Sequence, residues 1–311
     1  MMWMPWITLF AGLLILVWAS DWLVDGAIAL AGRLGLSPLV VGLTVVAYGT
    51  SLPEFVVSLL AASNGVSDIA VGNVVGSNIA NFGLAWGAAL LVGTGLITQK
   101  SVYRREVPAV LLASLAFVAL GFDGTFTRIE GAFLLGFAVI YTVAALRGDH
   151  SETEESSTDA TLPKAILLLI AGVAGLVFGA DLMVDGAVLI ARGYGINERI
   201  IGLTIIALGT SLPEVAATVS AARKNEGELA LGNILGSCLF NLTFVIGGAS
   251  IFTPLLVDDA SKGFDIPVML GVSVLAATLI YVFKKGSRWH GALLMLSYFT
   301  FLGVLANQTF N

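Results

Sequence analysis

Glu54 and Glu214 are the residues most able to do chemistry, because each lies inside a long apolar stretch that contains no Lys or Arg. A carboxylate in hydrocarbon costs several kcal/mol, so an intramembrane acid is by default functional or paired. Without a basic partner, such an acid binds a cation or carries a proton. The alternative is a protonated glutamate that is hydrogen-bonded for structural reasons alone.

Hydroxyl groups accompany both acids at helical spacing. Thr50 and Ser51 precede Glu54 by four and three residues, and Thr210 and Ser211 stand at the same positions in the second motif. Residues three and four apart share one face of a helix, so each motif is expected to present three oxygen-bearing side chains together.

Prolines next to the acids are expected to free backbone oxygens. Pro53 and Pro213 each remove a backbone donor and clash with the carbonyl four residues back, so we expect a kink in each helix. Freed carbonyls at membrane depth are tolerated where they are buried in protein or line a site. The candidates are the carbonyls of Ala47, Thr50, Ala207 and Thr210.

Two further segments each carry a polar stripe on an otherwise apolar helix. The residues of each stripe recur every four positions, and they are Asn73, Ser77 and Asn81 in the first half and Asn233, Ser237 and Asn241 in the second. Neighbouring glycines allow close approach of the backbones, and interhelical hydrogen bonding is the plain structural alternative for these side chains. We expect Asn73 and Asn233 to be structural.

The donor set is therefore carboxylate, amide, hydroxyl and carbonyl oxygen, which suits the hard cations Ca²⁺ and Na⁺. The lone cysteine, Cys238, excludes a multi-cysteine metal site, and His150 and His290 lie in charged loops. An intramembrane Ser-His hydrolase or a zinc enzyme lacks its residues, so we expect neither an enzyme nor a resident cofactor.

The elements that position these residues are membrane helices. Of 311 residues, 57% are hydrophobic and 12% charged, and no basic, aromatic-rich stretch points to nucleic acid. Apolar runs long enough to cross the bilayer recur throughout, so we predict an all-α integral membrane protein. The ten expected helices lie near 4–31, 37–62, 68–96, 107–122, 127–146, 164–193, 197–222, 227–252, 264–284 and 289–307.

An internal repeat organises the chain. Residues 42–54 (GLTVVAYGTSLPE) and 202–214 (GLTIIALGTSLPE) agree at ten of thirteen positions, and the same offset of 160 pairs the two polar stripes. Five crossings per half is an odd number, so the halves must be inverted, which places a binding site near the bilayer midplane.

The expected domains follow from this repeat. Residues 1–146 form the first five-helix repeat, 147–163 an acidic polar linker and 164–311 the second five-helix repeat. Eleven Lys and Arg residues lie in loops on the same side of the membrane as the linker, and four lie on the opposite side. Because cytoplasmic loops carry the excess of basic residues, we predict that the linker is cytoplasmic and that both termini lie outside the cytoplasm. The offset also pairs Asp21 and Asp25 with Asp181 and Asp185, which we expect near helix ends, capping or meeting headgroups, with a cation-attracting vestibule as the alternative.

GTSLPE in both halves, with GNVVGSNIANFG and GNILGSCLFNLT, resembles the alpha repeats of the sodium/calcium exchangers in the cation/calcium exchanger superfamily. The resemblance implies exchange of Na⁺ for Ca²⁺ by alternating access, with the first and sixth helices sliding across the others. It also implies a prokaryotic-type protein of the cell membrane without a regulatory domain. Its partners are then Ca²⁺, Na⁺ and lipid, and we take a monomer as the working expectation.

The resemblance also implies roles for individual residues. Glu54 and Glu214 match the family's Ca²⁺ ligands, which share Na⁺ sites. The further matches to Na⁺ or Ca²⁺ ligands, or to residues close to the central site, are Thr50, Ser51, Thr210, Ser211, Ser77, Ser237, Asn81, Asn241 and the carbonyls of Ala47 and Ala207. Potassium-dependent relatives carry Asp where this chain has Asn241, so K⁺ coupling is disfavoured.

The charges of the two glutamates also predict ion exchange, independently of the resemblance. One Ca²⁺ or two Na⁺ would neutralise two ionised glutamates, so either loaded form could cross the low-dielectric barrier. Two alternatives stay open. A Ca²⁺/H⁺ exchanger of the same fold could use a glutamate that releases a proton, and a passive cation channel is a more distant possibility.

Overall fold

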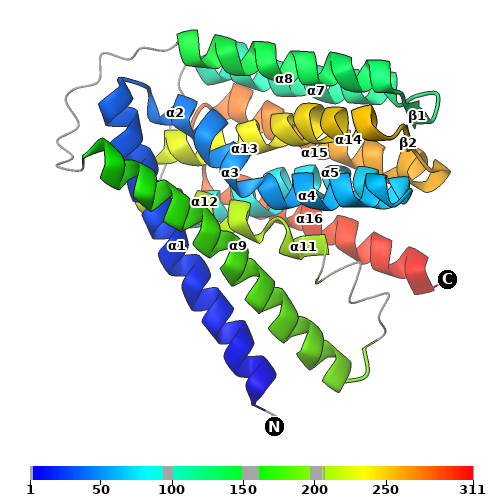
Figure 1. The fold of residues 1–311 in the computed structure, drawn as a ribbon, viewed down its shortest axis with the longest axis horizontal. Coiled ribbons are helices and arrows are strands. Elements are labelled where there is room, and N and C mark those ends of the chain that lie inside the picture. Colours follow the sequence, from blue (N-terminus) through cyan, green and yellow to red (C-terminus); the bar gives the residue numbers. More distant parts are fainter. Residues whose placement is uncertain (1–2, 94–100, 149–160, 197–204, 206, 311) are drawn as a thin grey trace.

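The computed structural model describes residues 3–93, 101–148, 161–196, 205 and 207–310, and almost all of them are helical (Figure 1). The helices of residues 3–148 are α1 (Met4–Leu34), α2 (Pro38–Val41), the π-helix η1 (Gly42–Val46), α3 (Ala47–Thr50), α4 (Leu52–Ser63), α5 (Ser67–Ala80), the π-helix η2 (Asn81–Trp86), α6 (Gly87–Val92), the π-helix η3 (Val102–Glu106), α7 (Val107–Leu120) and α8 (Arg128–Gly148). The helices of residues 161–310 are α9 (Leu162–Gly193), α11 (Ala207–Gly209), α12 (Leu212–Arg223), α13 (Gly227–Phe240), the π-helix η5 (Asn241–Val245), α14 (Ile246–Phe252), the π-helix η6 (Ser261–Asp265), α15 (Ile266–Phe283) and α16 (Arg288–Phe310).

Among the described residues, seven helices are long and apolar enough to cross a membrane, and the bent pair Pro38–Thr50 and Leu52–Ser63 makes an eighth if it is one span. The chain is thus an all-helical membrane protein, as predicted. The seven are Met4–Leu34, Ser67–Val92, Arg128–Arg147, Leu162–Gly193, Gly227–Phe252, Ser261–Phe283 and Arg288–Asn307.

The total of ten helices stays a prediction. The segment expected at 107–122 is found as α7, whose 14 residues are short for a span on their own. Part of the helix expected at 197–222, and most of the linker expected at 147–163, lie outside the described residues.

Burial divides the spans into a centre and a periphery. The most apolar window of Gly227–Phe252 is 94% buried within the protein and that of Ser67–Val92 is 78% buried, whereas those of α1, α8, α9 and α16 are 22–33% buried. The peripheral helices expose apolar side chains that lipid would cover. Polar residues on the two central spans are therefore shielded from lipid by other helices.

The helices α1 and α9 pack against each other along most of their length and extend beyond the other helices in Figure 1. Their seam is made of small residues. A Cβ added at Gly12 would lie 2.5 Å from the backbone nitrogen of Met183, and one added at Gly186 would lie 2.5 Å from that of Leu9. Only glycine allows backbones this close, so α1 and α9 form one tightly packed antiparallel pair.

A short β ladder, which the sequence analysis did not predict, ties two connections together. Strand β1 (Thr125–Phe126) pairs antiparallel with β2 (Leu255–Leu256), with Thr125 opposite Leu256. The ladder joins the α7–α8 connection to the segment that follows α14. It fixes one end of the bundle and contributes nothing to the polar centre.

Candidate cation-binding site

The first motif lies at a break between two helices. Helix α3 ends at Thr50, Ser51 stands in the break, and α4 begins at Leu52, with an angle of 46° between the pieces. The expected kink within a continuous helix is therefore a complete interruption. Pro53 falls in the first turn of α4, where its missing N–H would have no helical partner in any case. Glu54 consequently lies in the first turn, at the positive end of the helix dipole.

The second motif repeats this arrangement. Helix α11 ends at Gly209, and α12 begins at Leu212 with Pro213 and Glu214 in its first turn. Thr210 and Ser211 form the turn between the two helices. Both acids are thus held by the same local structure, a helix start immediately after a threonine–serine turn.

The two acids face one shared polar centre. Glu54 and Glu214 are both 0% exposed. The Ser51 hydroxyl donates to Glu214 Oε1 at 2.7 Å, and the Ser211 hydroxyl donates to Glu54 Oε1 at 3.5 Å. Each motif's serine therefore binds the glutamate of the other motif. The ion pairs found among the described residues all lie elsewhere, so these carboxylates are not neutralised by a basic side chain.

Helix α5 adds a third hydroxyl to this centre. The Ser77 hydroxyl donates to Glu54 Oε1 at 3.4 Å and accepts a hydrogen bond from Ser211 at 3.2 Å. The equivalent residue of α13, Ser237, is fully buried, and its oxygen has no hydrogen-bond partner among the described residues. The two serines of the polar stripes thus differ, one bound to an acid and the other free to take a ligand.

The asparagines at the start of the stripes tie the broken helices together. Asn73 donates to the Glu54 carbonyl at 3.2 Å and accepts from Thr210 at 3.4 Å. Asn233 accepts from Thr50 at 3.3 Å. These side chains fasten one motif to the stripe of the other half, the structural role expected for them.

Ser58 and Thr218 complete these contacts and were missed by the sequence analysis. Asn73 donates to the Ser58 hydroxyl at 3.0 Å, and Asn233 donates to the Thr218 hydroxyl at 2.9 Å. Each lies one turn beyond its glutamate, and the two are 160 residues apart. The repeat offset was therefore a signal that could have found them.

Several oxygen-bearing groups of the two motifs and of the ends of the stripes lack hydrogen-bond partners. They are Glu54 Oε2, Glu214 Oε2 and the whole side-chain amides of Asn81 and Asn241, all buried among the described residues. A buried polar atom without a partner costs about 1–3 kcal/mol, so such a set is stable where a ligand satisfies it. Within the described ranges, no group of three or more His, Cys, Asp or Glu side chains is arranged to hold a metal ion. The donor chemistry fits a hard cation bound by two carboxylates and neutral oxygens.

The carbonyl oxygens of the breaks differ between the two halves. The Ala47 carbonyl accepts the Ser51 N–H at 3.0 Å and the Thr50 hydroxyl at 3.3 Å. In the second half, the Ser211 N–H donates to the Leu208 carbonyl at 3.1 Å. The expected use of the Ala47 and Ala207 carbonyls as ligands stays a prediction.

Glycines and π-helical turns bring these elements together. A Cβ added at Gly236 would lie 2.4 Å from the Leu43 carbonyl oxygen, so α13 meets the first motif at backbone distance, as expected. The same expectation is not met for α5, where a Cβ added at Gly72 or Gly76 would have no described atom within 4 Å. The π-helices η2 and η5 begin at Asn81 and Asn241. Single π-helical turns often mark functional sites, and this feature is not visible in the sequence.

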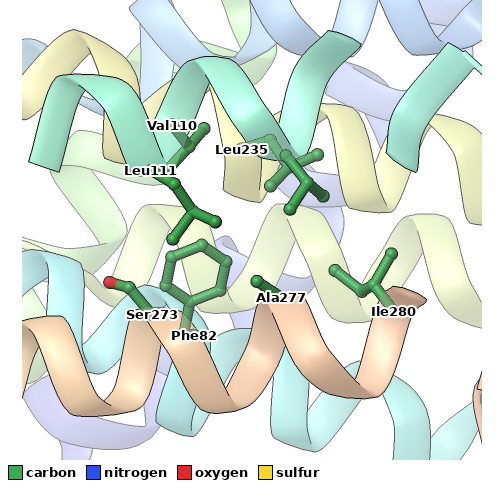
Figure 2. Close-up of a pocket in the computed structure, with 8 residues that line it drawn as sticks. Phe82, Val110, Leu111, Leu235, Ser273, Ala277 and Ile280 are labelled. Atoms are coloured by element: carbon green, nitrogen blue, oxygen red, sulfur yellow. The ribbon is translucent and has the colours of Figure 1, made fainter. Parts of the chain in front are cut away.

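An apolar pocket between η2, α7, α13 and α15 is a poor candidate for a cation site. Figure 2 shows Phe82, Val110, Leu111 and Leu235 around it, with Ser273 as the polar member. The Ser273 hydroxyl already donates to the Met269 carbonyl at 2.7 Å. None of the residues that line this pocket is ionisable, so cation chemistry belongs to the two glutamates.

Comparison with known families decides what kind of protein contains this site. A family model described as "Sodium/calcium exchanger protein" matches residues 4–147 and 164–306. The chain belongs to the sodium/calcium exchanger family. Members of this family are transporters rather than enzymes, and this exchanger is accordingly a membrane-embedded cation/calcium antiporter.

Individual relatives match the exchanger over nearly its full length. Inner membrane protein YrbG of Escherichia coli K12 is 39% identical over 285 residues, covering 88% of this chain and 87% of the relative. Sodium/calcium exchanger MaX1 of Methanosarcina acetivorans is 32% identical over 340 residues, covering 96% and 97%. A solved structure of the sodium-calcium exchanger NCX_Mj, soaked with zero Na⁺ and Ca²⁺, superposes with a TM-score of 0.87 at 31% identity and covers 98% of this chain and 100% of that one.

Proposed function

We propose that this protein is a secondary active antiporter that exchanges Na⁺ for Ca²⁺ by alternating access and does not need K⁺. The observation that carries the proposal is the pair of buried acids, Glu54 and Glu214, neither of which has a basic partner. Each acid accepts a hydrogen bond from the serine of the other motif, Glu214 from Ser51 and Glu54 from Ser211. The names of MaX1 and NCX_Mj as sodium/calcium exchangers support Na⁺ as the counter-ion.

The proposed ligands are the residues that surround this pair. Glu54 and Glu214 supply the charge for Ca²⁺ and share it with Na⁺, while hydroxyls, amides and carbonyls complete the coordination shells. The full set is Glu54, Glu214, Thr50, Ser51, Thr210, Ser211, Ser77, Ser237, Asn81, Asn241 and the carbonyls of Ala47 and Ala207.

Charge compensation explains why exchange is obligatory. Two ionised glutamates balance one Ca²⁺ or two Na⁺, so a loaded centre approaches neutrality. An empty centre would carry two negative charges through the low-dielectric interior during the transition, which is strongly unfavourable. The ion-free protein therefore resists the transition, and net uniport is suppressed.

Neutral amides at Asn81 and Asn241 support independence from K⁺. These side chains lie at the starts of η2 and η5 and add oxygen without adding charge. The centre therefore has two carboxylate charges to balance, and neither exchange partner requires a further monovalent cation to reach neutrality.

The proposal includes ten membrane helices in two inverted five-helix repeats, with both termini outside the cytoplasm of a prokaryotic cell. The reciprocal hydrogen bonds between the two motifs support a two-fold relation between the halves. The closely packed pair of α1 and α9 supports a rigid element that moves as one body across the rest.

The test is ⁴⁵Ca²⁺ uptake into Na⁺-loaded proteoliposomes that contain the purified protein. We expect uptake that depends on internal Na⁺, falls when external Na⁺ is added and is unchanged when K⁺ replaces choline outside. The variants Glu54→Gln and Glu214→Gln should abolish uptake, since each leaves one buried charge against a divalent ion.

The same experiment separates the alternatives. Uptake that persists without Na⁺ and follows an imposed pH gradient would identify a Ca²⁺/H⁺ exchanger instead. Uptake that follows the Ca²⁺ gradient alone, without any counter-ion, would identify a channel. Activity retained in both glutamine variants would remove the acids from the mechanism.

A further inference from the structure

A polar cluster joins α1 to the end of α12, far along the chain from one another. Lys224 Nζ donates to Asp25 Oδ1 at 2.6 Å and to the Asp21 main-chain oxygen at 3.1 Å. The Ser220 hydroxyl donates to Asp21 Oδ1 at 2.6 Å. Asp21 and Asp25 lie within α1 and not at its ends, so the expectation of capping is wrong for them. We call Asp21, Asp25, Ser220 and Lys224 the α1–α12 latch.

The other half of the protein has the acids of this latch but not its cation. The repeat offset of 160 pairs Asp21 and Asp25 with Asp181 and Asp185 of α9. The same offset pairs Ser220 and Lys224 with Leu60 and Asn64 at the end of α4. Neither Leu60 nor Asn64 can form an ion pair with the acids of α9.

The packing of the helices also differs between the two halves. Helix α1 packs along α12, whereas the corresponding helices of the other half, α9 and α4, barely touch. The α1–α9 pair therefore packs more closely on α12 than on α4, in what we call the α12-seated state. In a protein with inverted repeats, the opposite state exchanges these packings and places α9 on α4.

We propose that the α1–α12 latch stabilises the α12-seated state and has no equivalent in the opposite, α4-seated state, so that it makes the two states of the transport cycle unequal. The inference rests on the alternating access of the proposed function. Movement of the α1–α9 pair towards α4 would separate Lys224 from Asp25 and Ser220 from Asp21. Asp181 and Asp185 would then approach Leu60 and Asn64 and gain no ion pair.

The expected effect is modest because the latch is partly exposed. The side chains of Lys224 and Asp25 are 29% and 55% exposed. Ion pairs of this kind shift an equilibrium by about two- to fivefold and weaken with added salt. The latch therefore biases the two states without locking either, as a transporter that must pass through both requires.

The test measures the populations of the two states directly. Spin labels at Leu34→Cys, on the exposed end of α1, and Leu146→Cys, on the exposed end of α8, are introduced after Cys238→Ala removes the native thiol. Electron–electron double resonance then gives the distance distribution in lipid nanodiscs at saturating Ca²⁺, because the loaded protein can pass between the two states. We expect Lys224→Gln to lower the ratio of α12-seated to α4-seated protein by about two- to fivefold.

Three further variants make the result specific. Asp25→Asn should shift the ratio in the same direction as Lys224→Gln, and the double variant should shift no further than Lys224→Gln alone, because Lys224→Gln already removes the ion pair with Asp25 together with the weaker one to Asp21. Asn64→Lys should shift the ratio the opposite way by supplying α9 with the missing cation. Lys262→Gln is the matched control, since its ion pair with Asp259 lies within one short segment and should change nothing.

The outcomes separate the latch from the proposed function. Shifted populations in a protein that shows no Na⁺-driven Ca²⁺ uptake would retain the latch and remove the transport proposal. The latch is overturned if Lys224→Gln matches Lys262→Gln, if the effects of Asp25→Asn and Lys224→Gln add, or if one unchanging distance is seen in every variant.

Discussion

Replacing Glu214 by Gln separates an ion-binding acid from a structural one. The change keeps the size of the side chain and its acceptor for the Ser51 hydroxyl but removes one of two buried charges. We expect Ca²⁺ binding to weaken greatly while the ion-free protein becomes more stable. The second effect arises because the amide relieves the cost of a buried, unpaired charge next to Glu54.

The size of the binding effect follows from the burial of the site. With Ca²⁺ bound, Glu54 alone leaves one positive charge uncompensated in a fully buried centre, which costs about 3–5 kcal/mol. This corresponds to a loss of about 10²–10⁴-fold in affinity. At a Ca²⁺ concentration about 1,000 times the wild-type Kd, ligand stabilisation is about 4 kcal/mol, and a 10³-fold weaker site retains about 0.4 kcal/mol.

Thermal unfolding of the detergent-solubilised protein, with and without Ca²⁺, measures both effects, and isothermal titration gives the affinity. Glu106→Gln is a matched control. Glu106 is another buried glutamate, but its carboxylate accepts from Tyr141 of α8 and lies outside the site. Its Ca²⁺-dependent rise in Tm should equal that of the wild type. A Glu214→Gln protein with an unchanged Ca²⁺-dependent rise in Tm would refute the reasoning and show that the acid is structural.

Three further predictions test other parts of the site. Ser51→Ala removes the 2.7 Å hydrogen bond to Glu214, so Ca²⁺ affinity by titration should fall about 10–100-fold with little change in the ion-free Tm. Gly236→Ala places a Cβ 2.4 Å from a backbone oxygen and should destabilise the protein by about 1–3 kcal/mol in denaturant titration, whereas Gly136→Ala, in open space, should not. Asn241→Asp adds a third buried carboxylate, so Na⁺-driven Ca²⁺ uptake should slow and become sensitive to added monovalent cations, and uptake identical to wild type would contradict the charge argument.

The site was largely predictable because its residues are costly in lipid. A glutamate in an apolar stretch is conspicuous by its type alone, and the repeat offset of 160 then identified the partners of Glu54 in the other half. The same offset extends to Ser58 and Thr218, which were overlooked although their hydroxyls bind Asn73 and Asn233. Repetition of polar residues was thus a stronger guide than hydropathy.

The exact course of the backbone was less predictable. Proline at 53 indicated a disturbed helix, but the sequence does not distinguish a kink from the full break at Ser51, since that depends on the packing of both pieces. The π-helical turns at Asn81 and Asn241 have the same origin. A π-helical turn has hydrogen bonds between residues five apart, and no residue type or spacing in the sequence marks it. Such a turn persists only where neighbouring helices support it.

By itself, the amino-acid sequence determined the apolar spans, the duplicated motifs and the oxygen-rich donor set, because these depend on residue type and spacing and on the cost of polar groups in hydrocarbon. Only the tertiary structure decided which serine binds which acid and that α1 lies on α12 through Lys224 while α9 hardly touches α4. The two halves carry nearly the same motifs, so sequence predicts equal packing. The physical reason for the difference is that packing also depends on the positions where the halves differ, since Ser220 and Lys224 stand where the first half has Leu60 and Asn64.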